Sequence, residues 1–239
     1  MIDKLKWLAR KLPFAITKNL KYDRQTRAVI KKCCSIDSNC IDVGCHKGEV
    51  LDVILGYAPN GTHYAFEPIP YLFDELKENY QHKNVAVYNL ALSDTQSVTN
   101  FTLVPDNPEY SGLRRRKYDK EDEKVELIET KTDLLDNIVS GNTKIDFIKI
   151  DVEGAELQVL TGAKETIKRS KPVIVFEHGL GASDYYGTTP NDIHNLLVDQ
   201  CGMKISLMER WLKNKNALTK AEFLDQYNSG LNFYYIAYY

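Results

Sequence analysis

The order of apolar and polar positions along the chain predicts a domain in which strands and helices alternate. Residues 1–35 have the spacing of helices, with an interruption at Pro13. Short apolar runs then predict strands at 40–43, 62–66 and 85–90, with helices between them at 48–55 and 70–79. A βαβαβ succession with short connections is typical of a parallel sheet covered by helices.

The pattern resumes after a long polar stretch, from about 105 to 124, which predicts a functional loop. The later predictions are strands at 125–131, 145–150 and 173–176, helices at 132–139 and 155–168, and two final strands, 204–208 and 232–239, that pair with each other. Thr189 and Pro190 predict a further helix start, because Thr is favoured as N-cap and Pro at the first helical position.

Length and composition favour one soluble domain. The 239 residues suffice for a single α/β core, and we divide them into an N-terminal helical extension, 1–35, and a main domain, 36–239. The net charge of -2 gives no reason to expect a nucleic-acid partner. Five cysteines without a CxxC pair favour reduced thiols, and therefore a cytoplasmic protein, over a disulfide framework or a zinc site.

The first fourteen residues are basic and amphipathic. Lys and Arg interrupt their apolar positions, so they do not form a secretory signal, and no apolar run in the chain approaches the roughly 20 residues of a membrane span. Such a segment could lie on an anionic membrane surface. The simpler prediction is a helix packed on the domain.

A nucleoside site is predicted where the first two strands end. The segment 40–49 carries Asp42 and then Gly44, and Gly48 opens the next helix. Glycine permits a tight turn and close approach of a ligand to the backbone, and open α/β sheets bind ligands outside the carboxyl ends of their strands. Glu67 ends the second strand, where a carboxylate can accept both hydroxyl protons of a ribose.

The spacing of the two glycines distinguishes this predicted nucleoside site from a dinucleotide-binding site. A pyrophosphate needs several exposed backbone amides, supplied by GxGxxG, whereas this chain has GxxxG. Glu49 also places a carboxylate in the first helical turn, where it would repel a pyrophosphate. A nucleotide-dependent oxidoreductase and a non-catalytic nucleoside-binding module remain as alternatives.

Several segments together resemble the FkbM methyltransferases. They are IDVGCHKGE (41–49), YAFEPIPYLFDEL (64–76), NVAVYNLALSD (84–94), IDFIKIDVEGAELQVLTGA (145–163) and VIVFEHG (173–179). The resemblance spans roughly 36–180, in the order of the family, and IDVEGAE after an apolar strand is its most specific part.

The resemblance implies a Rossmann-like, mostly parallel seven-stranded sheet with helices on both faces. It also implies S-adenosylmethionine as the methyl donor and, frequently, O-methylation of a sugar or natural-product hydroxyl. The residues we assign to the cofactor site are Asp42, Gly44, His46, Gly48, Glu67, Pro68, Asp151 and, near the adenine, Ala91, Leu92 and Ser93. We expect a small-molecule acceptor, such as a sugar or glycoside.

The chemistry is predicted at two further strand ends. Asp151 and Glu153 follow the strand 145–150, and Glu177 and His178 follow the next strand, so the four are expected to converge beside the methyl group. A sugar hydroxyl is a poor nucleophile that a general base or a metal would assist. His178 or Asp151 is the favoured base. Carboxylates with an imidazole also suit Mg²⁺ or Mn²⁺, and pure alignment of the reactants is a third possibility.

Two further features concern the acceptor. The basic run 114–117 could bind an anionic group, but the acids at 119–123 favour a solvated loop. Tyr110, Tyr185 and Tyr186 could stack on a sugar face.

Overall fold

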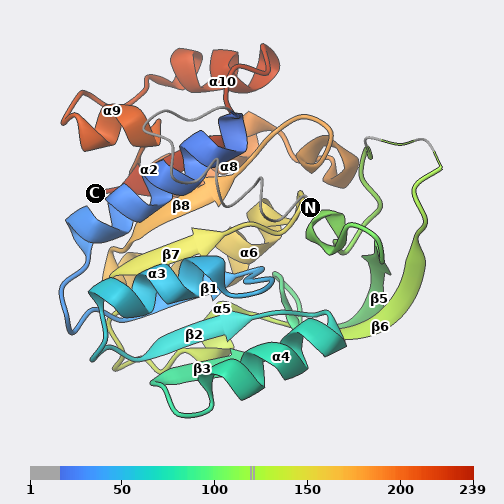
Figure 1. Ribbon diagram of the computed structural model, residues 1–239. Helices are drawn as coiled ribbons and strands as arrows, with labels where there is room; N and C mark the ends of the chain where they lie inside the picture. Colours follow the sequence, from blue (N-terminus) through green and yellow to red (C-terminus); the bar gives the residue numbers. More distant parts are fainter. Residues whose placement is uncertain (1–16, 119, 121) are drawn as a thin grey trace.

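A seven-stranded sheet runs through the computed structural model, which describes residues 17–239 except 119 and 121 (Figure 1). Its strands are, in spatial order, β3 (Val85–Tyr88), β2 (His63–Phe66), β1 (Cys40–Val43), β7 (Phe147–Ile150), β8 (Val173–Glu177), β10 (Tyr234–Tyr238) and β9 (Lys204–Ser206). All neighbouring pairs are parallel except the two that involve β10. The predicted α/β fold with a mostly parallel sheet is confirmed, and the expected interruption at Pro13 lies outside the described residues.

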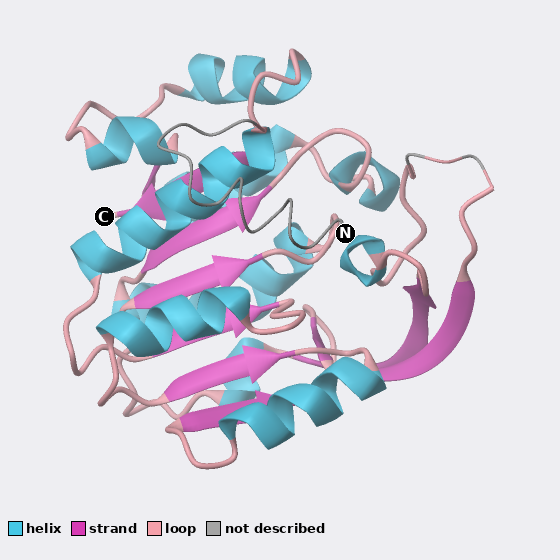
Figure 2. Ribbon diagram, viewed as in Figure 1, coloured by secondary structure: helices cyan, strands magenta, loops and turns pink. Residues whose placement is uncertain are grey.

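Helices cover both faces of this sheet, with α2 and α3 in front and α5 and α6 behind (Figures 1 and 2). The helices are α2 (Lys18–Cys33), α3 (Glu49–Tyr57), α4 (Pro70–Tyr80), α5 (Leu135–Ile138), α6 (Glu156–Gly162), α7 (Lys164–Ser170), α8 (Pro190–His194), α9 (Met208–Leu212) and α10 (Lys220–Asn228). Single 3₁₀ turns span Pro108–Tyr110 and Ser183–Tyr186, and a π-helical segment, Asn195–Gln200, continues α8. Over the described residues, no helix is both long enough and apolar enough to cross a bilayer.

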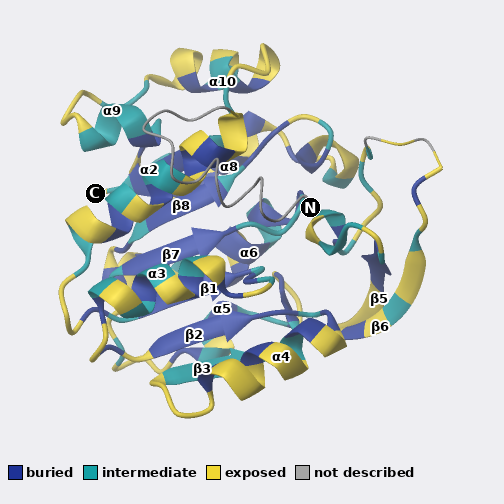
Figure 3. Ribbon diagram, viewed as in Figure 1, coloured by how far each residue is buried: buried dark blue, intermediate teal, exposed yellow. Residues whose placement is uncertain are grey.

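Alternate residues of the central strands enter two different cores. Phe147 and Val175 pack in the cluster that contains Ile30 of α2, whereas Ile148 and Phe176 belong to the cluster on the opposite face. Successive strand side chains point to opposite faces, and both faces here are covered, so these strands are buried throughout (Figure 3). A polar residue two positions from Phe147 or Val175 therefore lies on the α2 side of the sheet.

A smaller three-stranded sheet stands beside the main one (Figure 2). It contains β4 (Ala91–Leu92), β6 (Glu126–Asp133) and β5 (Ser97–Leu103). The predicted helix at 132–139 is wrong in its first part, because Thr132 continues β6 and pairs with both Ala91 and Ser97. The strand β5 was not predicted from the sequence, since its first four residues are exposed and show no burial pattern.

The predicted helix start at Thr189 is confirmed as a capping box. The Thr189 hydroxyl accepts a hydrogen bond from the backbone N–H of Asp192, and the Asp192 carboxylate accepts one from the backbone N–H of Thr189. The final two predicted strands also pair, as antiparallel β9 and β10.

Candidate active site

A cavity of about 1060 Å³ opens at the carboxyl ends of β1, β2, β7 and β8. The sequence-predicted residues that line it are Asp42, Gly44, His46, Glu67, Pro68, Ala91, Leu92, Asp151, Glu153 and Glu177. Three predicted residues do not line it: Gly48, Ser93 and His178. Ligands of open α/β sheets bind at this edge, where the strand order reverses, here between β1 and β7.

Two glycines shape the loop between β1 and α3. Gly44 has a φ of +73°, and a Cβ there would collide with the backbone carbonyl of Asp151. Gly48 has a φ of +85° at the N-cap of α3, where a Cβ would collide with the Tyr80 hydroxyl. Glycine adopts this left-handed region without steric cost. Gly48 therefore makes room for Tyr80 at the start of α3, while Gly44 brings the β1 and β7 loops into contact.

Glu67 joins the two loops that border the first part of the cavity. Its Oε2 accepts a hydrogen bond from the backbone N–H of His46 (2.9 Å), and its Oε1 accepts one from the backbone N–H of Ile69 (2.9 Å). A carboxylate has about four lone-pair sites, so each oxygen can accept one bond more. Burial raises the pKa of Glu67 to about 7, although the two N–H donors oppose the shift.

Asp42 is a buried carboxylate that lacks a full set of partners. It is 2% exposed, and among the described residues its Oδ2 has no hydrogen-bond partner. Burial raises the pKa of Asp42 to about 7, and the nearby Lys149 only partly offsets this. Because buried polar atoms are normally hydrogen-bonded, this oxygen fits a ligand that brings a donor or a positive charge.

The raised pKa values predict how the stability of the ligand-free chain depends on pH. The folded-state pKa of Asp42 and Glu67 is about 7, above the unfolded values of about 4, so their favourable contribution is present at low pH and lost as pH rises through 7. The thermal midpoint should fall between about pH 5 and pH 8. Calorimetry should show that the thermal midpoint falls less with pH in Asp42→Asn than in the native chain. In Asp74→Asn, which alters an exposed carboxylate, the midpoint should fall as much as in the native chain. An equal fall in Asp42→Asn and the native chain would contradict the raised pKa.

The expected adenine side is only partly exposed to the cavity. Pro68, Ala91 and Leu92 line it. The side chain of Ser93 instead donates to Asp94 (3.3 Å), and its backbone N–H donates to the carbonyl of Asp133 (2.9 Å). Ser93 therefore supports β4 rather than facing a ligand.

Three carboxylates gather at the other end of the cavity, with oxygens of Asp151, Glu153 and Glu177 within 4.8 Å of one another. Burial raises the pKa of Glu177 well above its ordinary value, and the Asp151 charge adds to the effect. Burial alone would raise the pKa of Asp151, but Lys149, Glu177 and Tyr234 together lower it to about 2. The pair therefore holds one proton, which Glu177 donates to an ionised Asp151.

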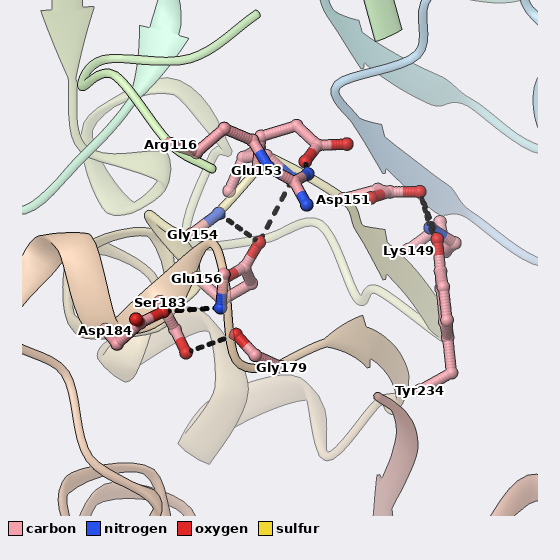
Figure 4. Close-up of polar contacts among 12 residues, drawn as sticks. Arg116, Lys149, Asp151, Glu153, Gly154, Glu156, Gly179, Ser183, Asp184 and Tyr234 are labelled. Carbon is pink, nitrogen blue, oxygen red and sulfur yellow. Dashed lines mark hydrogen bonds and ion pairs between the residues drawn. The ribbon is translucent and has the colours of Figure 1, made fainter. Parts of the chain in front are cut away.

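Two cations neutralise this carboxylate cluster. The ammonium of Lys149 donates to Asp151 Oδ2 (2.8 Å), and the Tyr234 hydroxyl donates to the same oxygen (Figure 4). Arg116 forms an ion pair with Glu153. Two of the three carboxylates thus have a cationic partner already, and the structure gives no support to an Mg²⁺ or Mn²⁺ site here.

The loop after β5 borders this end of the cavity. Tyr110 and Arg116 line the cavity, and the Arg116 guanidinium lies 5.2 Å from the centre of the Tyr110 ring. The solvated-loop interpretation of the basic run is wrong for Arg116, which is partly buried, whereas Arg114 and Arg115 are exposed. Arg114 still contacts the fold, because its backbone N–H bonds the Tyr186 hydroxyl (2.8 Å).

The prediction that His178 converges with the three carboxylates is wrong. Its side chain is fully buried, and its ring stacks on Tyr227 with centroids 4.6 Å apart. In the part of the chain that the structure describes, neither ring nitrogen has a hydrogen-bond partner. Burial lowers the pKa of His178 to about 3. The physical reason is strand alternation: Glu177 shares the face of Val175, so the next residue must point to the other side.

Three residues of the site were not predicted from the sequence: Lys149, Glu156 and Tyr234. Glu156 is 1% exposed, and its Oε1 accepts bonds from the backbone N–H groups of Val152 (3.2 Å) and Gly154 (3.1 Å), which fixes the turn that carries Glu153. Lys149 could have been found, because it lies two positions before Asp151 on the same face of a strand. No sequence pattern pointed to Tyr234, because its position in the site depends on the pairing of β10 with β8.

Comparison with known proteins places the chain among the S-adenosylmethionine-dependent methyltransferases, which have a Rossmann-like fold. The methyltransferase FkbM domain matches residues 42–205, and the chain therefore belongs to the FkbM methyltransferase family.

Two curated relatives and one crystal structure are similar to the chain. The 2-O-methyltransferase NoeI of Sinorhizobium fredii is 29% identical, over 65% of this chain and 68% of NoeI. The antimetabolite synthetase AmbE of Pseudomonas aeruginosa is 27% identical over 59% of this chain, which spans only 8% of AmbE. The crystal structure of methyltransferase FkbM from Methylobacillus flagellatus superposes with a TM-score of 0.54 and 17% identity, over 86% of this chain and 44% of that one. The last similarity concerns the fold alone.

Proposed function

We propose that this chain is an O-methyltransferase that methylates a hydroxyl of a sugar or natural-product small molecule, using S-adenosylmethionine. The observation that carries the proposal is the Asp151–Glu177 pair, which presents an ionised carboxylate within the same cavity as the predicted nucleoside site. An ionised carboxylate is able to receive the proton that a hydroxyl must lose.

The residues at the β1 and β2 end suit the methyl donor. Glu67 retains lone pairs for the ribose hydroxyls, and the Gly44 turn lets a ligand approach the backbone. Asp42 places a carboxylate where a cationic ligand would favour its ionised form. When bound, S-adenosylmethionine supplies a methyl group on a positively charged sulfur that leaves as a neutral thioether.

At the β7 and β8 end, Asp151 is the residue we assign as base. The hydroxyl of the acceptor becomes far more acidic as its oxygen begins to bond to the methyl carbon. A carboxylate of low pKa, such as that of Asp151, can therefore still accept the hydroxyl proton. Glu177 keeps the pair at a single negative charge, which limits repulsion within the buried cluster. The relative NoeI is a 2-O-methyltransferase, which supports oxygen as the acceptor atom.

The test is methyl transfer to matched acceptors. The chain should be incubated with ¹³C-methyl-labelled S-adenosylmethionine and either simple glycosides or their amino-sugar counterparts, and the products analysed by NMR and mass spectrometry. The proposal predicts a methyl group on oxygen. Transfer only to the amino sugars would contradict it. Stabilisation by NAD but not by S-adenosylhomocysteine would favour the oxidoreductase alternative.

The aromatic ring at the acceptor end predicts a defined kinetic effect. Tyr110 lines the cavity beside Arg116, and a ring there can pack against the apolar face of a sugar. Tyr110→Ala should raise the acceptor KM by about 3- to 10-fold, a loss of about 1 kcal/mol, while the kcat and cofactor affinity stay close to native. Tyr110→Phe should retain the native KM. If both variants have the native KM, the ring does not contact the acceptor.

A further inference from the structure

Two side chains from different strands meet on one oxygen of the proposed base. Lys149 of β7 and Tyr234 of β10 both donate to Asp151 Oδ2, and the Lys149 ammonium lies 3.4 Å from the Tyr234 hydroxyl (Figure 4). Tyr234 is paired directly opposite Glu177 in the sheet. All four residues lie on the α2 side of the sheet, by the alternation of their strands.

We propose that Lys149 and Tyr234 are positioning residues for methyl transfer, which hold Asp151 by Oδ2 so that Oδ1 receives the proton of the acceptor hydroxyl. The proposal rests on the proposed function, because it takes Asp151 as the base.

The partners of the two carboxylate oxygens support this division. Oδ2 has two strong donors, whereas Oδ1 is buried and accepts from no amide, ammonium or phenol group of the described residues. The carboxyl proton of Glu177 is the further donor to Asp151, and a carboxylate oxygen that accepts it retains a second lone pair. Asp151 lines the cavity. A hydrogen-bonded pair of donors on one oxygen restricts rotation of the carboxyl group, which leaves the second oxygen in a fixed direction.

The burial of Lys149 ties its ammonium to a charged partner. Its side chain is 5% exposed, and an ammonium at that depth requires a charged partner. Asp151 is its ion-pair partner in the described part of the chain, and the Tyr234 ring, 4.7 Å from the ammonium, covers it further. Loss of either group would therefore change the charge environment of Asp151 directly.

Several other charged or titratable groups surround Asp151. They are Asp42 from β1, Glu153 and Glu156 from the turn and helix after β7, Glu177 from β8, Arg116 from the loop after β5, which acts on Glu153 and Glu177, and Asp23 of α2, which acts on Tyr234. Most of them are acidic. Removing Lys149 would thus leave Asp151 among like charges, which raises the pKa of a carboxyl group.

The experiment is a pair of pH measurements on Lys149→Met and Tyr234→Phe. In the first, the Asp151 carboxyl is titrated by ¹³C NMR in chain labelled at aspartate, with no acceptor present and with Asp151→Asn to assign the signal. In the second, the acid limb of the pH profile of kcat/KM is measured. The titration midpoint of Asp151 and the acid limb of the kcat/KM profile should both move to higher pH. The expected shift is about one to three pH units for Lys149→Met and less for Tyr234→Phe. Lys149→Arg should keep the native limb, because the charge is retained.

The chain offers matched controls. Lys144 pairs with Asp146 (2.7 Å), also two positions later, but it is exposed, so Lys144→Met should leave both measurements unchanged. Tyr238→Phe removes a hydroxyl from the same face of β10, outside the cavity. If Lys149→Met does not fold, Tyr234→Phe still tests the proposal, since it removes one oxygen atom.

The two readouts separate this inference from the proposed function. A native Asp151 titration in both variants would overturn the positioning role even if the chain methylates hydroxyls. A shifted titration in a chain that methylates only nitrogen would instead retain the contact and reject the proposed function. If the variants keep the native acid limb of the kcat/KM profile but have a lower kcat at every pH, Lys149 and Tyr234 have a purely structural role, and the proposal is also overturned.

Discussion

Replacing Asp151 with Asn should lower the turnover of methyl transfer by about 10²–10⁴, the usual contribution of a general base. An amide cannot accept the proton, although it preserves the size of the side chain and can still accept hydrogen bonds from Lys149 and Tyr234. The loss should fall on kcat, because the predicted cofactor contacts at Asp42 and Glu67 remain. Single-turnover kinetics with labelled cofactor measures the chemical step directly.

Two further variants show whether the effect belongs to the base. His178→Phe conserves the stacking on Tyr227 and should keep turnover within a few-fold of native, because His178 does not line the cavity. Asp146→Asn changes an aspartate before β7 that lies outside the cavity, and it should have little effect on transfer. Native turnover in Asp151→Asn, or a loss of 10² or more in His178→Phe, would contradict the assignment.

Glu67→Ala should weaken binding of S-adenosylhomocysteine by about 1–3 kcal/mol, which is roughly 5- to 150-fold in Kd. The variant loses the acceptor for the ribose hydroxyls. It also leaves the backbone N–H groups of His46 and Ile69 without their partner, so the loop over the nucleoside loses its anchor. Titration calorimetry at constant pH measures the loss.

The control for this variant is Glu75→Ala, which removes an exposed carboxylate of α4 and should bind like the native chain. Binding should also strengthen as pH rises through about 7 in the native chain, since the ionised forms of Asp42 and Glu67 favour a cationic cofactor. S-adenosylmethionine, whose sulfonium carries a positive charge, should show this dependence more than the product S-adenosylhomocysteine, whose thioether sulfur is uncharged. Unchanged affinity in Glu67→Ala would contradict its role as the ribose acceptor.

Much of the fold could be predicted because its central strands are buried on both faces. Runs such as 40–43 and 147–150 are continuously apolar apart from Asp42 and Lys149, which enter the site, and the helices between them show clear periodicity. The hairpin of β5 and β6 was harder, because exposed strands with mixed polar sequence give no such signal. Thr132 was assigned to a helix for this reason, although cross-strand pairing decides its conformation.

The site was predicted where it depends on local sequence and missed where it depends on pairing. Asp42 and Glu67 follow directly from the ends of their strands. The alternation of side chains along β8 could have excluded His178 from the predicted site. The same alternation along β7 could have added Lys149 to it. Tyr234 lies 83 positions from Asp151, and only the register of an antiparallel strand brings its hydroxyl to the carboxylate.

A crystal structure of the chain with S-adenosylhomocysteine tests the central claim most directly, that one cavity holds the donor at β1 and β2 and the acceptor at β7 and β8. The account predicts the ribose hydroxyls on the Glu67 carboxylate and the sulfur directed toward Asp151 and Glu177. A nucleoside bound away from Glu67, or a sulfur directed away from those two carboxylates, would contradict it.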